Sequence, residues 1–124
     1  MKCICCMALL SLATYSFGQT GKKKTNPVKK ASPATASAAD IEAGKALIQK
    51  ADCMTCHKLD IKLVGPAFMQ VAAKYPANDA NYASLAARII AGGSGVWGQI
   101  PMAPHATLSP ADAKKMAKYI LSLK

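Results

Sequence analysis

The chain has 124 residues, of which 52% are hydrophobic and only 18% are charged, so we expect these residues to form one small domain at most. Its formal net charge is +10, because 16 lysines and arginines stand against 6 aspartates and glutamates. A basic chain can bind nucleic acid or an anionic membrane, but no aromatic residues interleave with the lysine run at 22–24 to stack on bases. We therefore expect no nucleic-acid partner and interpret the run as a solvated stretch.

The first eighteen residues have the pattern of an export signal. Lys2 gives a positive start, a mostly apolar stretch covers residues 4–13, and Ser16 and Gly18 supply small residues at positions that a signal peptidase inspects. The apolar stretch is shorter than the roughly 20 residues that cross a bilayer. The sequence therefore predicts a cleaved signal peptide over residues 1–18, a periplasmic or otherwise exported protein, and no integral membrane span. A retained membrane anchor is the alternative.

A polar segment separates this signal from the folded part. Residues 19–39 carry five lysines and no acidic residue, and the remainder is mainly Thr, Pro, Ala, Ser and Gly. Such a segment has too little apolar mass to fold, which predicts a flexible linker. The domain then covers residues 40–124, close to the size at which a hydrophobic core alone gives marginal stability. A cofactor inside that core would add the missing apolar contact.

Helical periodicity recurs along this domain. Apolar residues spaced three and four positions apart predict three helices, over about 40–51, 66–75 and 81–91. Ser109, as an N-cap residue followed by Pro110, predicts a fourth helix that runs to the end of the domain. No run alternates apolar and polar residues, so we expect no strands and an irregular Gly- and Pro-rich segment over 92–107. The sequence thus predicts an all-α domain.

Two cysteines and a histidine stand in the pattern Cys-Met-Thr-Cys-His at residues 53–57. This is the spacing of covalent haem attachment, because two thiols on one helical turn can each add to a vinyl group on the same haem edge. The histidine that follows can reach the iron. Two alternatives remain open: a disulfide between Cys53 and Cys56, and a zinc site that also uses His57 and His105. Zinc needs four tetrahedral ligands with room between the pairs, and Cys56 and His57, being adjacent, would need an awkward geometry to bind the same ion.

A haem that carries electrons needs a sixth ligand on the face opposite the histidine. The candidates are Met54, Met69, Met102, Met116 and His105. Met54 lies between the two attachment cysteines and cannot reach the far face, whereas Met69 and Met116 belong to predicted helices, the latter on an apolar stripe. Met102 has prolines on both sides that stiffen an extended segment, which favours Met102 as the ligand. His105 stays open as a rival that would give a bis-histidine haem of lower potential.

Three further motifs follow the attachment pattern in order. They are Leu-Val-Gly-Pro-Ala-Phe at 63–68, Gly-Gly-Ser-Gly-Val-Trp-Gly at 92–98 and Ile-Pro-Met-Ala-Pro at 100–104. Together the motifs resemble those of the small bacterial class I cytochromes c, and the resemblance covers residues 40–124. It implies the short class I cytochrome c fold, with about four helices wrapped around one haem and an irregular distal loop.

The resemblance also implies a set of site residues. Cys53 and Cys56 would attach one haem c per chain through two thioethers, with His57 as the proximal and Met102 as the distal iron ligand. The Pro66 carbonyl would accept a hydrogen bond from the ring N–H of His57 and so fix the imidazole. By the same resemblance, Trp97 would pack at the haem edge and donate its indole N–H to a propionate. The lysine-rich lead and His105 depart from the pattern.

Filled axial positions indicate a function. With both positions occupied by protein, the iron has no open site for oxygen or substrate, so we expect a single-electron carrier and no enzymatic activity. Its partners would be redox proteins, such as a respiratory oxidase or reductase, that dock transiently on a monomer. A net positive domain suits acidic docking surfaces. The competing hypotheses are a ligand-binding or peroxidase-like haem domain, and a module stabilised by zinc or a disulfide without haem.

Overall fold

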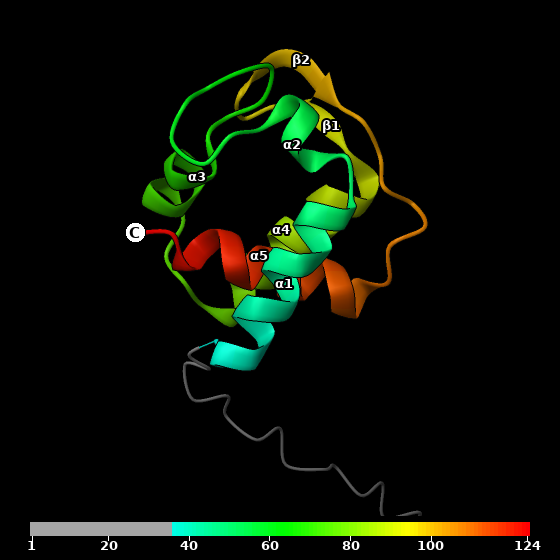
Figure 1. Cartoon of the computed structure of the whole chain (residues 1–124). Coiled ribbons are helices and arrows are strands. Elements are labelled where there is room, and N and C mark those ends of the chain that lie inside the picture. Colours follow the sequence, from blue (N-terminus) through cyan, green and yellow to red (C-terminus); the bar gives the residue numbers. More distant parts are fainter. Residues whose placement is uncertain (1–35) are drawn as a thin grey trace, which may run out of the picture. The chain divides into compact units, whose positions relative to one another are not determined.

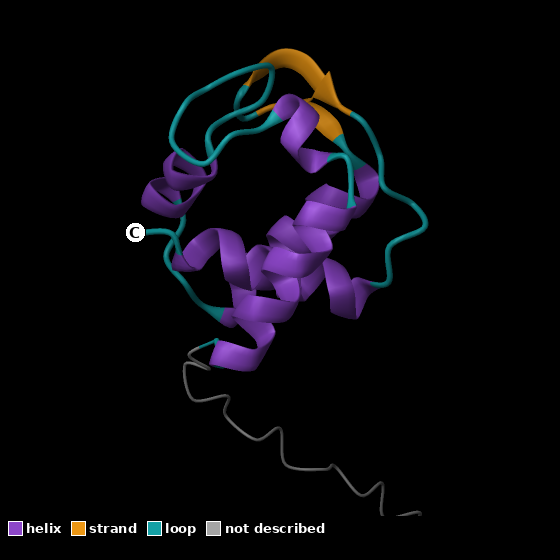
Figure 2. Ribbon diagram, viewed as in Figure 1, coloured by secondary structure: helices purple, strands orange, loops and turns teal. Residues whose placement is uncertain are grey.

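The computed structural model describes residues 36–124 of the chain, so the predicted signal peptide and nearly all of the predicted linker lie outside the described residues. The described part is mainly helical, with one small sheet (Figures 1 and 2). The elements in chain order are α1 (Ala38–Lys50), α2 (Cys53–Cys56), α3 (Phe68–Lys74), α4 (Asp79–Ala91), β1 (Gly93–Gly95), β2 (Gly98–Met102) and α5 (Pro110–Ser122). This arrangement confirms the predicted fold class. Helix α2, which carries the two cysteines of the attachment pattern and is called the attachment turn below, is an additional short helix.

The two end helices of the domain cross at a glycine. Helix α5 packs against α1, α3 and α4, and its crossing with α1 is visible near the centre of Figure 1. A Cβ atom placed on Gly44 would collide with the backbone carbonyl of Lys115 and lie 3.0 Å from Cβ of Tyr119. Only glycine therefore allows this close approach of α1 to α5.

The core lies between these helices. Its buried members are Ile48, Phe68, Val71, Tyr82, Ala86, Ile89, Ala113, Met116, Ile120 and Leu121. Most of them occupy the apolar stripes expected from the helical periodicity. At the rim of the crossing, Lys118 donates a hydrogen bond of 2.6 Å to Asp40. Hydrogen bonds from Lys118 and Ser37 lower the pKa of the Asp40 carboxyl, which keeps this link between α1 and α5 charged at neutral pH.

Capping side chains set the helix boundaries. The Ser37 hydroxyl accepts from the amide of Asp40 at 3.1 Å, so α1 begins two residues before the predicted start, inside the stretch expected to be linker. Asn78 caps α4 in the same way, which moves that start from Asn81 to Asp79. The fourth predicted helix is confirmed, because Ser109 caps α5 and accepts from the amide of Asp112.

The second predicted helix is shorter than expected at its first turn. Helix α3 begins at Phe68 instead of Pro66, and Ala67 is its N-cap residue. The carbonyl of Pro66 is oriented toward His57 and accepts a hydrogen bond from that ring. Pro66 therefore belongs to the loop that supports the histidine, and the helix starts only after it.

A hairpin replaces part of the segment expected to be irregular, and the prediction that the domain has no strands is wrong. Strands β1 and β2 are antiparallel, with Gly93 opposite Met102 and Gly95 opposite Gly98. Their residues are exposed except for a half-buried Met102, so neither face is buried and the sequence shows no apolar–polar alternation. Glycines with positive φ, among them Gly95 (114°) and Gly98 (127°), make the turn possible.

Among residues 36–124, no helix has the combination of length and apolar character that crossing a membrane requires.

Candidate haem site

The attachment turn presents two free thiols. Helix α2 is a single turn in which the amide of His57 donates to the carbonyl of Cys53 at 3.0 Å. Cys53 is half-buried, Cys56 is exposed, and neither forms a disulfide. Burial, aided by the neighbouring Asp52 carboxylate, raises the pKa of the Cys53 thiol. The two thiols thus stand unpaired on one turn, as covalent attachment to a haem requires.

Three neighbours hold the imidazole of His57 in one orientation. Its Nδ1 lies 2.8 Å from the carbonyl oxygen of Pro66, and a carbonyl can only accept, so Nδ1 carries the proton. Phe68 stacks on the ring, with centroids 5.2 Å apart and planes inclined by 16°. Gly65 lies against the ring as well, because a Cβ atom there would come within 2.8 Å of Nδ1. In the neutral ring, a proton on Nδ1 leaves the lone pair of Nε2 free for a metal.

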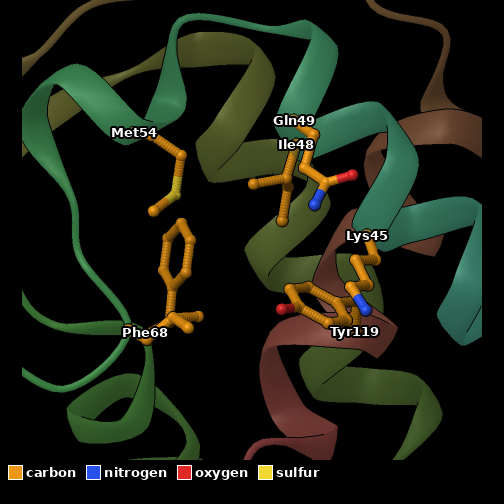
Figure 3. Close-up of a pocket in the computed structure, with 7 residues that line it drawn as sticks. Lys45, Ile48, Gln49, Met54, Phe68 and Tyr119 are labelled. Carbon is orange, nitrogen blue, oxygen red and sulfur yellow. The ribbon is translucent and has the colours of Figure 1, made fainter.

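A cavity of about 290 Å³ lies beside the attachment turn (Figure 3). Met54 of α2 and Phe68 of α3 form one wall in the figure, and Ile48 of α1 and Tyr119 of α5 lie across the opening from them. Because Phe68 also stacks on His57, the cavity adjoins the histidine side of the site.

The segment that carries Met102, residues 102–105, packs against the C-terminal end of α4. Met102 ends β2, is half-buried and packs against the core. Gly92, which ends α4 with φ of 67°, lies against the backbone of residues 102–104, and a Cβ atom there would be 2.8 Å from the Pro104 nitrogen. The amide of His105 then donates to the carbonyl of Ile90 at 3.0 Å. Met102 is therefore held on well-supported backbone.

The other candidate ligands are placed elsewhere. Met116 is 1% exposed in the core, as its position on an apolar stripe indicates, and Met69 on α3 is 46% exposed. Met54 belongs to the attachment turn itself and lines the cavity. The Nε2 atom of His105 lies 3.0 Å from the Asp52 carboxylate, so the ring that could rival Met102 is already paired.

The zinc hypothesis is not supported by the arrangement. Among residues 36–124, no group of three His, Cys, Asp or Glu side chains is gathered in a way that could hold a metal ion. The Asp52 partner takes His105 away from a shared site with the two cysteines and His57. Without His105, His57 is the nitrogen donor left beside the two cysteines. A single histidine suits a haem iron, because the ring nitrogens of the haem supply most of the other ligands.

Trp97 lies in the hairpin turn and is 36% exposed. The ammonium of Lys74, at the end of α3, lies 5.6 Å from the centroid of its ring. This contact joins the hairpin to α3. The expected hydrogen bond from the indole to a propionate stays a prediction.

Residues 41–124 match the family model for cytochrome c. The chain belongs to the cytochrome c family. Cytochrome c-552 of Nitrosomonas europaea is 50% identical over 78 residues, which cover 63% of this chain and 76% of the relative. Cytochrome c-551 of Azotobacter vinelandii is 48% identical over 83 residues, which cover 67% of this chain and all of the relative.

Solved structures agree with this assignment. The crystal structure of wild-type Nitrosomonas europaea cytochrome c552 superposes with a TM-score of 0.60 at 49% identity and covers 64% of this chain and 99% of that one. The protein therefore has the small class I cytochrome c fold. It is a single-electron carrier with one covalently bound c-type haem.

Sequence reasoning missed three contributors to this cytochrome c site. Gly65 and Phe68 stood out only as parts of a motif and a helix, yet both contact the His57 ring. Asp52 stands directly before the attachment turn and pairs with His105, a role that the sequence did not suggest. A glycine between an apolar residue and a proline is a signal for close backbone approach and could have indicated Gly65. No local signal links Asp52 to His105.

We expect Gly65→Ala to disturb the imidazole of this cytochrome c. The added Cβ atom would lie within 2.9 Å of both ring nitrogens of His57, so the ring must tilt away from the Pro66 carbonyl. Overpacking of this kind costs about 1–3 kcal/mol of unfolding free energy, measurable by denaturant titration. The midpoint potential should shift as well, because the Pro66 hydrogen bond tunes the basicity of the imidazole.

Gly95→Ala is the matched control for this substitution. Gly95 has φ of 114°, and no atom lies within 4 Å of the position that a Cβ atom would take, so alanine strains the backbone without contacting His57. Its stability should fall while its potential stays unchanged. A potential unaffected by Gly65→Ala would contradict the role assigned to Gly65.

Proposed function

We propose that Cys53 and Cys56 attach the haem, that His57 and Met102 are its axial ligands, and that the protein is not an enzyme. The hydrogen bond from His57 Nδ1 to the Pro66 carbonyl carries this proposal. It fixes one tautomer, directs the Nε2 lone pair to a metal and increases the electron donation of the ring. A histidine with a merely structural role would not need a free, oriented Nε2.

The chain's own residues then account for electron transfer. A bound haem would supply a one-electron couple, and the side chains of His57 and Met102, by staying in place, would keep the change in geometry between oxidation states small. The thioether of Met102 favours the reduced state and raises the potential relative to imidazole. The supports of Met102 at Gly92 and Ile90 keep the ligand-bearing segment in one position, which excludes other molecules from the iron.

The surface of the domain supports transient docking of redox proteins on a monomer. Residues 40–124 contain ten basic and six acidic residues, which favours partners with acidic surfaces and association rates that fall with salt. Exposed apolar side chains lie on the loop after His57 and on the hairpin: Leu59, Ile61, Leu63, Val64, Val96, Trp97 and Ile100. These side chains lie on the segments next to His57 and Met102, so they would border the bound haem, and a redox partner would dock where its edge is reached.

The location proposed for the protein is outside the cytoplasm, after removal of residues 1–18. The support is the order of charged, apolar and small residues in that segment, together with a haem attachment pattern. The composition of residues 19–39, apart from the two last residues, which belong to α1, supports a flexible linker between the cleavage site and the domain.

Two measurements on the exported full-length protein test the proposed function. Acid–acetone extraction should leave the haem colour with the polypeptide, because thioether bonds survive it. The reduced protein should show no spectral change under carbon monoxide at neutral pH, because both axial positions are filled. Formation of a carbon monoxide adduct would favour a ligand-binding haem domain. Complete extraction of the haem would contradict attachment through Cys53 and Cys56.

A further inference from the structure

His105 connects two segments that lie far apart in the sequence. Its Nε2 is 3.0 Å from Oδ1 of Asp52, and the two residues are 53 positions apart. A carboxylate only accepts hydrogen bonds, so Nε2–H is the donor. Asp52 directly precedes Cys53, whereas His105 stands three residues after Met102. The hydrogen bond thus joins the segments that carry the two proposed axial ligands.

Within residues 36–124, this hydrogen bond ties the Met102 segment to the attachment turn, while other contacts hold the segment elsewhere. The backbone of residues 102–105 is held against the end of α4 by Gly92 and by the carbonyl of Ile90. On the side of α2, His105 donates to Asp52. Among the described residues, this is the one side-chain hydrogen bond that links residues 93–108 to another segment. Loss of this bond would leave the segment held by its contacts with α4 and, through Trp97, with α3, and would remove its hydrogen bond to the attachment turn.

The Asp52 carboxylate makes an unusual hydrogen bond for a residue at the start of a helix. Asp52 is the N-cap residue of α2, where an aspartate ordinarily accepts from a backbone amide of the first turn, but its side chain makes no such bond. It is 78% exposed and bonds to His105, whose side chain is only 16% exposed. The second ring nitrogen of His105, Nδ1, is buried without a hydrogen-bond partner among the described residues, so the ring makes its side-chain hydrogen bond through Nε2 to Asp52.

We propose that the hydrogen bond between His105 and Asp52 is a clasp that positions the Met102 segment against the haem-attachment turn and slows release of the Met102 thioether. The clasp rests on the proposed function, because it acts on Met102 as an axial ligand. His105 and Asp52 are positioning residues, and neither contacts the iron. His105, which the sequence left open as a rival ligand of the iron, thus supports Met102 through its hydrogen bond to Asp52.

The expected change in the rate of Met102 release follows from the exposure of the hydrogen-bonded pair, His105 and Asp52. A hydrogen-bonded pair with one exposed partner is worth a factor of about two to five in an equilibrium. Imidazole added to the ferric protein binds only after Met102 leaves the iron, so its binding rate reports release of the thioether. We expect Asp52→Ala and His105→Phe each to raise this rate by about two- to five-fold. Phenylalanine retains a ring of similar volume without the Nε2 donor.

Matched variants separate the clasp from general destabilisation. Asp52→Asn keeps an oxygen that can accept from Nε2, so its rate should stay near that of the wild type. Asp79→Asn removes a comparable surface pair, Asp79 with Lys114 at 3.3 Å, without touching either ligand-bearing segment. Its imidazole rate should be unchanged even if its melting temperature falls. The double variant Asp52→Ala/His105→Phe should be no faster than the faster single variant, because both remove one bond.

Two results would overturn the clasp. Imidazole rates that are unchanged in both single variants would show that the hydrogen bond does not restrain Met102. Multiplicative effects in the double variant would show that the residues act separately. A wild-type protein that binds imidazole as fast as its Met102→Ala variant would overturn both the clasp and the assignment of Met102. The Met102→Ala comparison therefore distinguishes failure of the clasp from failure of the proposed site.

Discussion

Replacing both Cys53 and Cys56 by serine is expected to abolish covalent haem attachment and to leave the domain largely unfolded. Domains of this size retain a net stability of only about 5–15 kcal/mol. Haem contact would supply much of the apolar burial that helices of 4 to 13 residues cannot achieve alone. Circular dichroism and acid–acetone extraction of the purified double variant measure the two losses. Single variants should keep one thioether and an intermediate stability.

Cys56→Ser and Cys53→Ser should also differ from each other. Cys53 is half-buried and packs against the core, whereas Cys56 is exposed, so the polar hydroxyl is more costly at position 53. Equal stability of the haem-free double variant and the native protein would refute the view that haem completes the core. A haem that resists extraction in the double variant would show attachment elsewhere.

Local signals in the sequence were sufficient for most of the helices. Ser109 and Pro110 mark the start of α5 because capping and a fixed φ act within a few residues. The attachment pattern is equally local, since Cys53, Cys56 and His57 occupy one turn and its end. The histidine support at Pro66 came from family resemblance, and the structure shows the predicted hydrogen bond.

The parts that could not be predicted depend on long-range or unpatterned contacts. The hairpin has no buried face, so its residues follow no alternation that a sequence could display. Gly44 could be suspected at the helix crossing, but its contact with the carbonyl of Lys115 depends on how two separate helices meet. The pairing of Asp52 with His105 likewise depends on how the attachment turn meets the segment after β2, which neither residue indicates alone.

Replacing Met102 by histidine is expected to lower the midpoint potential on the order of 0.1 V, within the ~0.8 V range that axial ligands span. Imidazole is a harder and more basic ligand than a thioether, so it stabilises the oxidised iron relative to the reduced iron. The weak charge-transfer band from thioether sulfur to ferric iron should vanish in the same variant. If Met102 were an ordinary half-buried residue at the end of β2, neither quantity would move, because the haem environment would be unchanged.

Two methionine variants serve as controls for this assignment. Met116 is buried in the core and Met69 is exposed on α3, so Met116→Leu and Met69→Leu preserve volume and should keep both the band and the potential. Met102→Ala should differ from Met102→His by opening an axial position that carbon monoxide can occupy in the reduced protein. Retention of the charge-transfer band in Met102→His, or its loss in Met69→Leu, would move the ligand to another methionine. The fixed backbone at Gly92 and Ile90 would then support a segment without a ligand, and the clasp at His105 would have nothing to position.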